Sequence, residues 1–482
     1  MRPTRPADRT SATAPTADRA AVRPARRLRR TVAAGAVTVA LLAGLAPAAT
    51  AADRADGRSA SATERRLDRD GLRTGLDRIH EAGIFGVYSS VRDGRERFDG
   101  ASGVADVDTR RPVRADMRHR VGSVTKTFTS VAVLQQSAKG RIGLDRPVGD
   151  YVPELVPGER GRKVTVRMLL NHTSGISDYI LDAFPSLEQK NTTESLDEFR
   201  HRTIAPTELI RFGLARPQVN EPGAKWSYSN TNYIVLGEIL REVTGQDPER
   251  LITKDVIRKA GLRDTYFPGT DPRIRGAHSK MYENFYGLID PPRDYSDYNM
   301  TWAGTAGALV STTQDLNTFY RALLTGDLLP RRQLDQMRTT VEVRDPAGKV
   351  AMHYGLGIYT MDTPCGPVWG HDGGVWGAGT WSLSSPDGSR QFSIGYNLMK
   401  YQRVDETGTV FLPHPADAAV VDYMGLALCG KTAPTPAPKG AAPASPERRA
   451  PAPAAPAPSA PTRPTLPKTG PALPAPLAAP LR

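Results

Sequence analysis

The chain has 482 residues, which is long enough for more than one domain, and its formal net charge is +13. The excess charge lies at the two ends: residues 1–52 carry +7 and residues 431–482 carry +6, which leaves the middle of the chain neutral. A nucleic-acid-binding domain needs its basic field over a folded surface, so we expect no nucleic acid among the partners.

Residues 1–51 have the order of a secretory signal peptide. The basic stretch RPARRLRR precedes the apolar run TVAAGAVTVALLAGLAPAATA, which ends in the small-residue pattern Ala49-Thr50-Ala51. The apolar core of roughly 16 residues is short for a membrane span of about 20. We predict secretion with loss of residues 1–51, followed by a linker over 52–61. An uncleaved membrane anchor is the alternative.

Residues 62–430 form the predicted globular region, which begins with a helix over 62–83 and two strands joined at Asp93-Gly94. From Ser123 onward, Val124, Phe128 and Val131 recur at the spacing of a helix. The region 141–330 mixes helical segments with loops, and the clearest of these helices are YIVLGEILREVTG and TQDLNTFYRALLTG.

Strand signals return in PVWGH, GAGTWSLSSPDG and RQFSIGYNL, and a helix over 414–428 closes the region. Strands therefore occupy both ends of the region and helices fill its middle. We predict an α+β fold in which a mainly antiparallel sheet, flanked by terminal helices, carries an inserted and mostly helical subdomain.

The C-terminal segment 431–482 holds 16 prolines and is predicted to be a disordered tail. It contains LPKTG at 466–470, which resembles the wall-sorting signal that sortases read in Gram-positive bacteria. The residues that follow, PALPAPLAAPLR, include four prolines, which a membrane helix would not accommodate. Sortase-mediated attachment to the cell wall and a free tail therefore both stay open.

The two cysteines are Cys365 and Cys429. Export makes a disulfide between them an expectation, and two buried thiols are the alternative. The eight histidines are scattered, and no cluster of His, Cys or Asp has the spacing of metal ligands. We therefore predict neither a metal site nor a cofactor.

Ser123 and Lys126 are the first candidates for catalysis. Three residues apart on a helix, they share one face, and a lysine with a lowered pKa can take the proton of a serine hydroxyl. An N-cap serine followed by a solvated lysine gives the same pattern, and one S-x-x-K is expected by chance in a chain of this composition.

Two later segments add polar groups. Tyr228 and Asn230 lie in a loop before a helix, where a phenol of lowered pKa could shuttle protons and an amide could hold the lysine. Tyr282 and Asn284 have the same spacing, so spacing alone does not choose between the pairs. In VWGHDGGVWGAG, His371 could add positive potential or pass a proton, and the glycines allow backbone amides to approach a ligand.

Together, S-V-T-K, Y-S-N and H-D-G in this order resemble the marks of the serine β-lactamase and D-alanyl-D-alanine carboxypeptidase family. The connecting segments GRIGLDRPVGDYVPEL, VRMLLNHTSGISDY and AGALVSTTQDLNTF are also similar, and the resemblance covers about 75–430. The His form, the paired cysteines and the ending LCGK are most similar to secreted actinomycete D,D-carboxypeptidases. The resemblance selects Tyr228 over Tyr282.

The resemblance implies a covalent serine mechanism. Ser123 would form the acyl-enzyme, Lys126 and Tyr228 would share the proton transfers, and Asn230 would bind the substrate amide. The oxyanion would be held by the backbone N–H groups of Ser123 and Gly374. By position, Trp302 and Phe184 resemble aromatic residues that line the cleft of the family.

The implied activity is that of an exported D-alanyl-D-alanine carboxypeptidase that acts on peptidoglycan stem peptides and is acylated by β-lactams. Asp372 and Gly374 stand where the carboxypeptidases usually have hydroxyl residues that bind the terminal carboxylate, and Asp372 would repel that carboxylate. A β-lactamase-fold esterase, a D-amidase or a D-aminopeptidase therefore remains an alternative. A non-catalytic wall-binding protein is the third reading.

Overall fold

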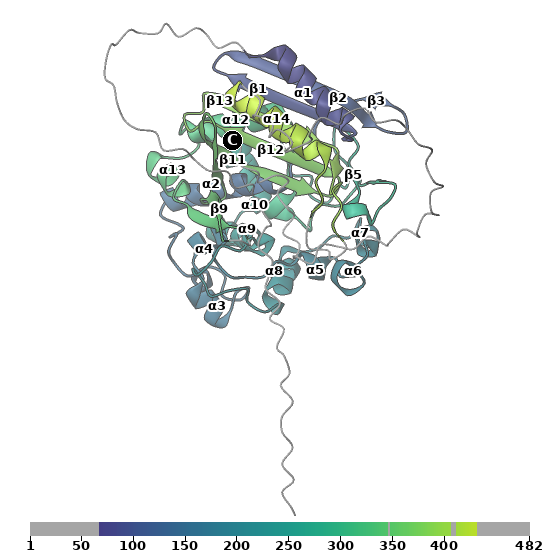
Figure 1. Ribbon diagram of the computed structural model, residues 1–482. Helices are drawn as coiled ribbons and strands as arrows, with labels where there is room; N and C mark the ends of the chain where they lie inside the picture. The colour runs from purple at the N-terminus through teal and green to yellow at the C-terminus, as the bar shows by residue number, and fades with distance from the viewer. Residues whose placement is uncertain (1–66, 346–347, 406–410, 431–482) are drawn as a thin grey trace, which may run out of the picture. The chain divides into compact units, whose positions relative to one another are not determined.

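The computed structural model describes residues 67–345, 348–405 and 411–430, and its centre is a nine-stranded antiparallel sheet. The spatial order is β3-β2-β1-β13-β12-β11-β10-β9-β8 (Figure 1). The strands are β1 (Gly86–Asp93), β2 (Glu96–Asp106), β3 (Arg111–Pro112), β8 (Val341–Arg344), β9 (Val350–Tyr354), β10 (Tyr359–Thr363), β11 (Gly366–Val375), β12 (Ala378–Ser384) and β13 (Arg390–Tyr396).

The two ends of the described region meet in this sheet. β1 pairs with β13 in antiparallel register, with Val87 opposite Tyr396, and β1 also pairs with β2 across the turn at Gly94. Strands far apart in the sequence therefore lie side by side. This confirms the predicted α+β fold with one sheet built from both ends.

Helices α1 (Arg69–Glu81) and α14 (Pro415–Cys429) pack against each other along the sheet (Figure 1). Leu72 and Ile79 of α1 and Met424 of α14 are buried in one core with sheet residues such as Val91 and Phe392. Since these helices stand at opposite ends of the region, their contact closes the fold.

A second and larger core contains the helical subdomain, whose central helices are α2 (Thr125–Ala138) and α9 (Asn230–Thr244). Helix α12 (Thr313–Leu324) belongs to the same core and packs on β1, β12 and β13 of the large sheet. α2 is buried along most of its length, as expected of a helix at the centre of a domain. The other α-helices are α3 (Gly158–Lys163), α4 (Val166–Leu170), α5 (Ile180–Ala183), α6 (Ser186–Gln189), α7 (Glu194–Glu198), α8 (Pro206–Ala215), α10 (Pro248–Ile252), α11 (Gly304–Gly307) and α13 (Arg331–Met337).

Short elements complete the subdomain. β4 (His119–Arg120) pairs with β7 (Val310–Ser311), and β5 (Tyr282–Glu283) lies between β6 (Arg293–Asp294) and β14 (Leu398–Met399). Single turns of tighter or wider helix are η1 (Gly122–Val124), η2 (Val148–Asp150), η3 (Thr253–Ile257) and η4 (Phe285–Gly287). Within 67–345, 348–405 and 411–430, every helix is too short or too polar to span a bilayer. The predicted signal peptide, linker and LPKTG tail lie outside the described residues.

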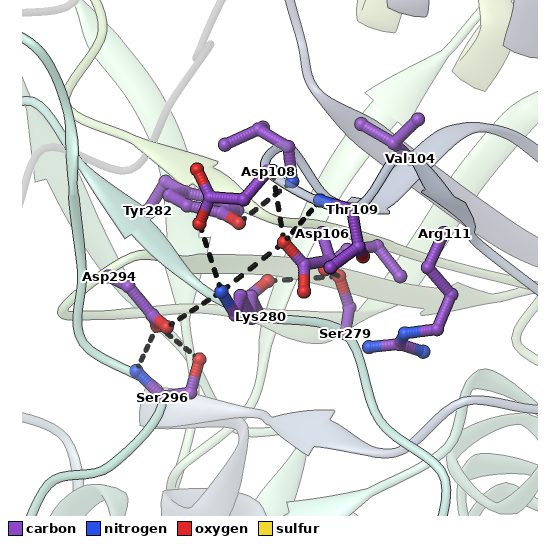
Figure 2. A network of polar contacts seen from close by, with 12 residues as sticks. Val104, Asp106, Asp108, Thr109, Arg111, Ser279, Lys280, Tyr282, Asp294 and Ser296 are labelled. Carbon is purple, nitrogen blue, oxygen red and sulfur yellow. Dashed lines mark hydrogen bonds and ion pairs between the residues drawn. The ribbon is translucent and has the colours of Figure 1, made fainter.

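A network of ion pairs joins the insertion to the edge of the large sheet (Figure 2). The Lys280 ammonium lies 3.2 Å from a carboxylate oxygen of Asp106 and 3.2 Å from one of Asp108, and 3.9 Å from Asp294. Asp106 ends β2, whereas Asp294 belongs to β6, so one lysine connects two sheets. The described residues contain no group of His, Cys, Asp and Glu arranged to hold a metal ion.

Cys365 and Cys429 form a disulfide that ties the β10–β11 turn to the last residue of α14. The expectation of a disulfide is thus confirmed. The bond closes a loop with a sequence separation of 64 residues.

Removing this bond is expected to lower the free energy of unfolding by about 4 kcal/mol, because the unfolded chain regains the entropy of the open loop. Replacing both cysteines by serine and measuring urea denaturation tests this. Acyl-enzyme formation by the folded variant should be unchanged, because the bond lies outside the catalytic cluster described below. A stability equal to that of the wild type would contradict the expectation.

Candidate active site

Ser123 lies in the tight turn η1, directly before α2. Gly122 has a φ of +53°, and a Cβ there would come within 2.7 Å of the Gly374 nitrogen. A Cβ at Gly373 would in turn come within 2.9 Å of the Ser123 nitrogen. Glycine is therefore required at both positions so that β11 can pass against the turn that carries the serine. This close approach brings the backbone of Gly374, the predicted oxyanion donor, next to Ser123.

Two side chains converge on the Ser123 hydroxyl. The Lys126 Nζ atom lies 3.0 Å from Ser123 Oγ, one turn further along α2, and the Tyr228 hydroxyl donates a hydrogen bond of 2.6 Å to the same oxygen. Ser123 is 9% exposed and Lys126 is fully buried, whereas Tyr228 is half-buried, so the cluster borders the surface on the side of the phenol. Three residues predicted from two separate motifs are thus brought together.

Lys126 is fully buried, and its amine has three partners. Besides Ser123, it lies 2.8 Å from Asn230 Oδ1 and 2.8 Å from the backbone oxygen of Ala306. Burial lowers the pKa of Lys126 to about 7, although the carboxylates of Asp178 and Asp372 act in the opposite direction. A large fraction of the amine is therefore neutral at neutral pH and is able to accept a proton.

Tyr228 precedes α9 and packs on a buried imidazole. Its ring centroid lies 4.3 Å from that of His172, and Lys126 Nζ lies 4.8 Å from the Tyr228 ring centroid. Burial raises the pKa of Tyr228 well above its usual range. The expectation of a lowered phenol pKa was therefore wrong, since desolvation outweighs the hydrogen bond with Ser123. Tyr228 is a protonated group that can relay or donate a proton.

His371 lies on β11 and is 2% exposed. Its Nδ1 donates to the backbone oxygen of Asp372 at 2.5 Å, and its Nε2 then accepts from the Tyr354 hydroxyl at 2.9 Å. Burial lowers the pKa of His371 to about 3, so the ring is neutral at neutral pH. The expectation that it adds positive potential was wrong, and what remains is a neutral imidazole with two hydrogen-bond partners.

Asn230 begins α9 and holds Lys126, as predicted, through the 2.8 Å contact of its Oδ1 atom. Phe184 and Trp302 are brought together as well, with their ring centroids 5.4 Å apart. Trp302 also stacks on Trp376 at 5.1 Å, a residue of the β11–β12 turn that the sequence did not single out. The three rings are buried and form one aromatic cluster.

Asp178 is a further residue that the sequence reasoning missed. Its Oδ2 accepts from the backbone nitrogen of Asn230 at 2.7 Å and from Asn230 Nδ2 at 2.8 Å. The residue lies in the connector NHTSGISDY, where a loop aspartate carries no signal of its own. Its partner stands 52 positions away, and only the fold brings them together.

Comparison with known sequences shows the family of this chain. The sequence profile of the family described as Beta-lactamase matches residues 73–407, which is more than half of the chain. The chain belongs to the beta-lactamase family. It accordingly has the β-lactamase fold.

Two curated relatives of the chain have different names. Esterase EstB of Burkholderia gladioli is 31% identical over 224 residues, which are 44% of this chain and 56% of the esterase. Penicillin-binding protein 4* of Bacillus subtilis is 25% identical over 321 residues, or 64% of this chain and 66% of that protein. The chain thus spans between half and two thirds of the length of these relatives.

Solved structures of the family agree with the fold. A D-stereospecific amidohydrolase from Streptomyces sp. matches with a TM-score of 0.66 and 34% identity, covering 76% of this chain and all of that one. The D-amino acid amidase of Ochrobactrum anthropi SV3 matches with a TM-score of 0.59 and 23% identity, over 68% of this chain and 91% of that one. At 23% identity, the similarity to the D-amino acid amidase shows a shared fold and no more.

Proposed function

We propose that the chain is an exported serine hydrolase that cleaves amides of D-configured amino acids through an acyl-enzyme on Ser123. The observation that carries this proposal is the carboxylate of Asp372, which lies close enough to Lys126 and Tyr228 for its charge to raise the pKa of each. The leaving group of a simple amide or ester carries no charge and is compatible with this carboxylate. The leaving group of a peptide with a free C-terminus carries a carboxylate, which Asp372 would repel.

The proposed reaction uses the contacts of Ser123. As Ser123 Oγ forms a bond to the substrate carbonyl carbon, its proton passes to the neutral amine of Lys126. The N–H groups of Ser123 and Gly374 bind the resulting oxyanion. Tyr228 then relays the proton held by Lys126 to the departing nitrogen, so that the C–N bond breaks, the amine leaves as a neutral molecule, and both the phenol and the neutral amine of Lys126 are restored. In the second half of the reaction, water attacks the carbonyl carbon of the acyl-enzyme ester and loses a proton to the base. The bond between that carbon and Ser123 Oγ then breaks, and Ser123 Oγ regains its proton.

Asp372 shapes the choice of substrate in this proposal. Its side chain is 15% exposed, and burial raises its pKa to about 6, so that it is mostly anionic at neutral pH. Its charge acts on both Lys126 and Tyr228. A substrate carboxylate at about 4 Å would be repelled by up to roughly 4 kcal/mol in the dielectric of a protein surface. β10 contributes no arginine that could offset this charge.

The likeness to the D-stereospecific amidohydrolase supports the same conclusion, because it has 34% identity and extends over the whole of that chain. A D-alanyl-D-alanine carboxypeptidase that acts on stem peptides and is acylated by β-lactams is the second candidate. It is favoured by the similarity to penicillin-binding protein 4*. The similarity to an esterase keeps short esters among the test substrates. A wall-binding protein without catalysis would not need the short contacts between Ser123, Lys126 and Tyr228.

Replacing Asp372 with asparagine is expected to raise kcat/KM for a D-Ala-D-Ala peptide about tenfold, because the repulsion of its terminal carboxylate is removed. Hydrolysis of a D-amino acid amide should change much less. Steady-state rates measure the ratio of kcat/KM for the peptide to that for the amide, in the variant and in the wild type. The matched control is Asp362→Asn, which changes an exposed aspartate on β10. If the wild type already cleaves the peptide better than the amide, the proposed preference is wrong and the carboxypeptidase reading replaces it.

Secretion, and attachment to the wall through LPKTG, also belong to this proposal. The disulfide between Cys365 and Cys429 supports secretion, because such bonds persist in oxidising compartments outside the cytosol. Mass spectrometry of protein taken from culture medium and from cell walls tests the proposal. Loss of residues 1–51 is expected, and wall attachment would leave the chain ending at Thr469 in amide linkage. An intact N-terminus in a cytosolic protein would contradict export.

A further inference from the structure

The amide of Asn230 is held between a carboxylate and an amine. On one side, Asp178 Oδ2 lies 2.8 Å from Asn230 Nδ2, and on the other side Asn230 Oδ1 lies 2.8 Å from Lys126 Nζ. Asp178 is itself fixed, since its two oxygens also accept from the backbone nitrogens of Ile180 and Asn230. Asn230 is 7% exposed, so water has little access to this chain of contacts.

Counting hydrogens at Lys126 shows what the amide does. A neutral amine has two hydrogens and one lone pair, and this amine has three neighbours: Asn230 Oδ1, the oxygen of Ala306, and Ser123 Oγ. The first two are oxygens that can only accept, so they take both hydrogens. The lone pair is left for the serine, the one neighbour that has a proton to give.

We infer that Asp178 is a positioning residue, which fixes the orientation of the Asn230 amide so that the lone pair of Lys126 stays directed at Ser123. The inference rests on the acyl-serine chemistry of the proposed function, but not on the identity of the substrate. An ionised carboxylate can only accept hydrogen bonds. The amide therefore turns its nitrogen toward Asp178 and its oxygen toward Lys126.

The alternative orientation would disable the base. With the amide reversed, its N–H groups would face the amine, and the Lys126 lone pair would accept from Asn230 instead of from Ser123. The oxygen of the amide would then face the Asp178 carboxylate at hydrogen-bond distance, and both atoms are acceptors. Asp178 thus excludes the reversed orientation of the Asn230 amide, which the neutral amine of Lys126 by itself would accept.

The charge of Asp178 acts on Lys126 as well, since it raises the pKa of the amine against the effect of burial. Replacing the carboxylate by an amide should therefore lower the pKa of Lys126. The titratable groups that act on this amine or lie against it come from several elements: Asp178, Asp372, His172, His371, Tyr228 and Tyr233. The two histidines are neutral at neutral pH because burial lowers the pKa of each, and burial keeps the two phenols protonated. Asp178 and Asp372 are the two groups among them whose charge raises the pKa of Lys126. Burial raises the pKa of Asp178 itself, and the hydrogen bonds that it accepts from Asn230 and Ile180 act in the opposite direction.

The test measures how fast a fluorophosphonate acylates the purified full-length chain between pH 5 and 9. This probe needs an activated serine but no particular acyl group, so the result does not depend on whether the natural substrate is a D-amino acid amide. For the wild type, the rate should rise with a midpoint near pH 7, the pKa of Lys126. The test variant is Asp178→Asn, which keeps the size of the side chain. The control is Asp182→Asn, which removes a carboxylate of the nearby helix α5 that is paired with Arg216.

Asp178→Asn is expected to move the midpoint down by about one pH unit and to lower the plateau rate about tenfold. Asp182→Asn should leave both unchanged. An unchanged midpoint together with a wild-type plateau in Asp178→Asn would overturn the inference.

A double-mutant cycle separates positioning from loss of structure. Asp178→Ala should lower the plateau about 100-fold in the wild type, but less than threefold in a chain that already carries Asn230→Ala, because the amide it orients is gone. Equal losses in the two backgrounds would show that Asp178 acts only on the local fold and would overturn the inference. If the wild type is not labelled at all, the acyl-serine chemistry itself fails, and the role of Asp178 fails with it.

Discussion

Replacing Ser123 with alanine is expected to lower the hydrolysis of D-amino acid amides and short esters by a factor of about 10⁵ or more, because no other group can form the acyl intermediate. The hydroxyl receives a hydrogen bond from Tyr228 at 2.6 Å and lies 3.0 Å from the Lys126 amine, so the site is organised around this one atom. Stopped assays with each substrate measure the loss, at enzyme concentrations high enough for the catalysed rate to exceed that of background hydrolysis.

The matched control is Ser137→Ala, which removes a serine hydroxyl from the same helix α2 at a half-buried position near its end. This variant should retain wild-type rates. Thermal unfolding of both variants should match the wild type within a few degrees, since each substitution removes a single oxygen atom. Turnover by Ser123→Ala above about one hundredth of the wild-type rate would mean that water or another residue attacks the substrate.

Replacing Lys126 with methionine is expected to slow acylation of Ser123 by a factor of about 10³ or more, because the serine loses its base. Methionine has a similar length and no charge, so the core around α2 should stay filled. Single-turnover labelling by a fluorophosphonate measures the acylation step by itself. Labelling within tenfold of the wild-type rate would contradict the assignment of Lys126 as the base.

The same variant tests the linkage between the buried amine and stability. Folding lowers the pKa of Lys126 from 10.5 to about 7, so the wild type loses stability as the pH falls from about 10.5 to 7, and the loss levels off below pH 7. Relative to the wild type, Lys126→Met should therefore gain about 4 kcal/mol over this pH range. Urea denaturation of both chains at pH 10 and pH 7 measures the gain. A difference in stability that does not depend on pH would show that the amine remains charged in the folded chain.

The sequence predicted the parts of the site that depend on short spacing or on ordered motifs. Ser123 and Lys126 face one another because residues three apart share one side of a helix. The choice of Tyr228 over Tyr282 required the order of the motifs along the chain, and in the structure Tyr282 lies in β5 with its hydroxyl bonded to the Val107 nitrogen. The single sheet built from both ends followed in the same way from the distribution of strand signals.

Properties set by the surroundings of a side chain could not be predicted. The charge states of His371 and Tyr228 depend on burial by segments far away in the sequence, and in both cases desolvation shifted the pKa against the expected direction. Asp178 and Trp376 were missed because their partners, Asn230 and Trp302, are more than 50 positions away. A loop aspartate and a turn tryptophan have no local pattern that reveals such contacts.

The most direct test of the account is peptide mapping of the wild type after reaction with a fluorophosphonate. Trypsin releases residues 121–126, VGSVTK, in which Ser123 is the one serine. The account predicts that this peptide alone gains the mass of one adduct, and that the adduct is absent from Ser123→Ala. An adduct on any other peptide, or an unmodified VGSVTK peptide in a folded wild-type protein, would contradict the claim that the amine and the phenol activate this serine.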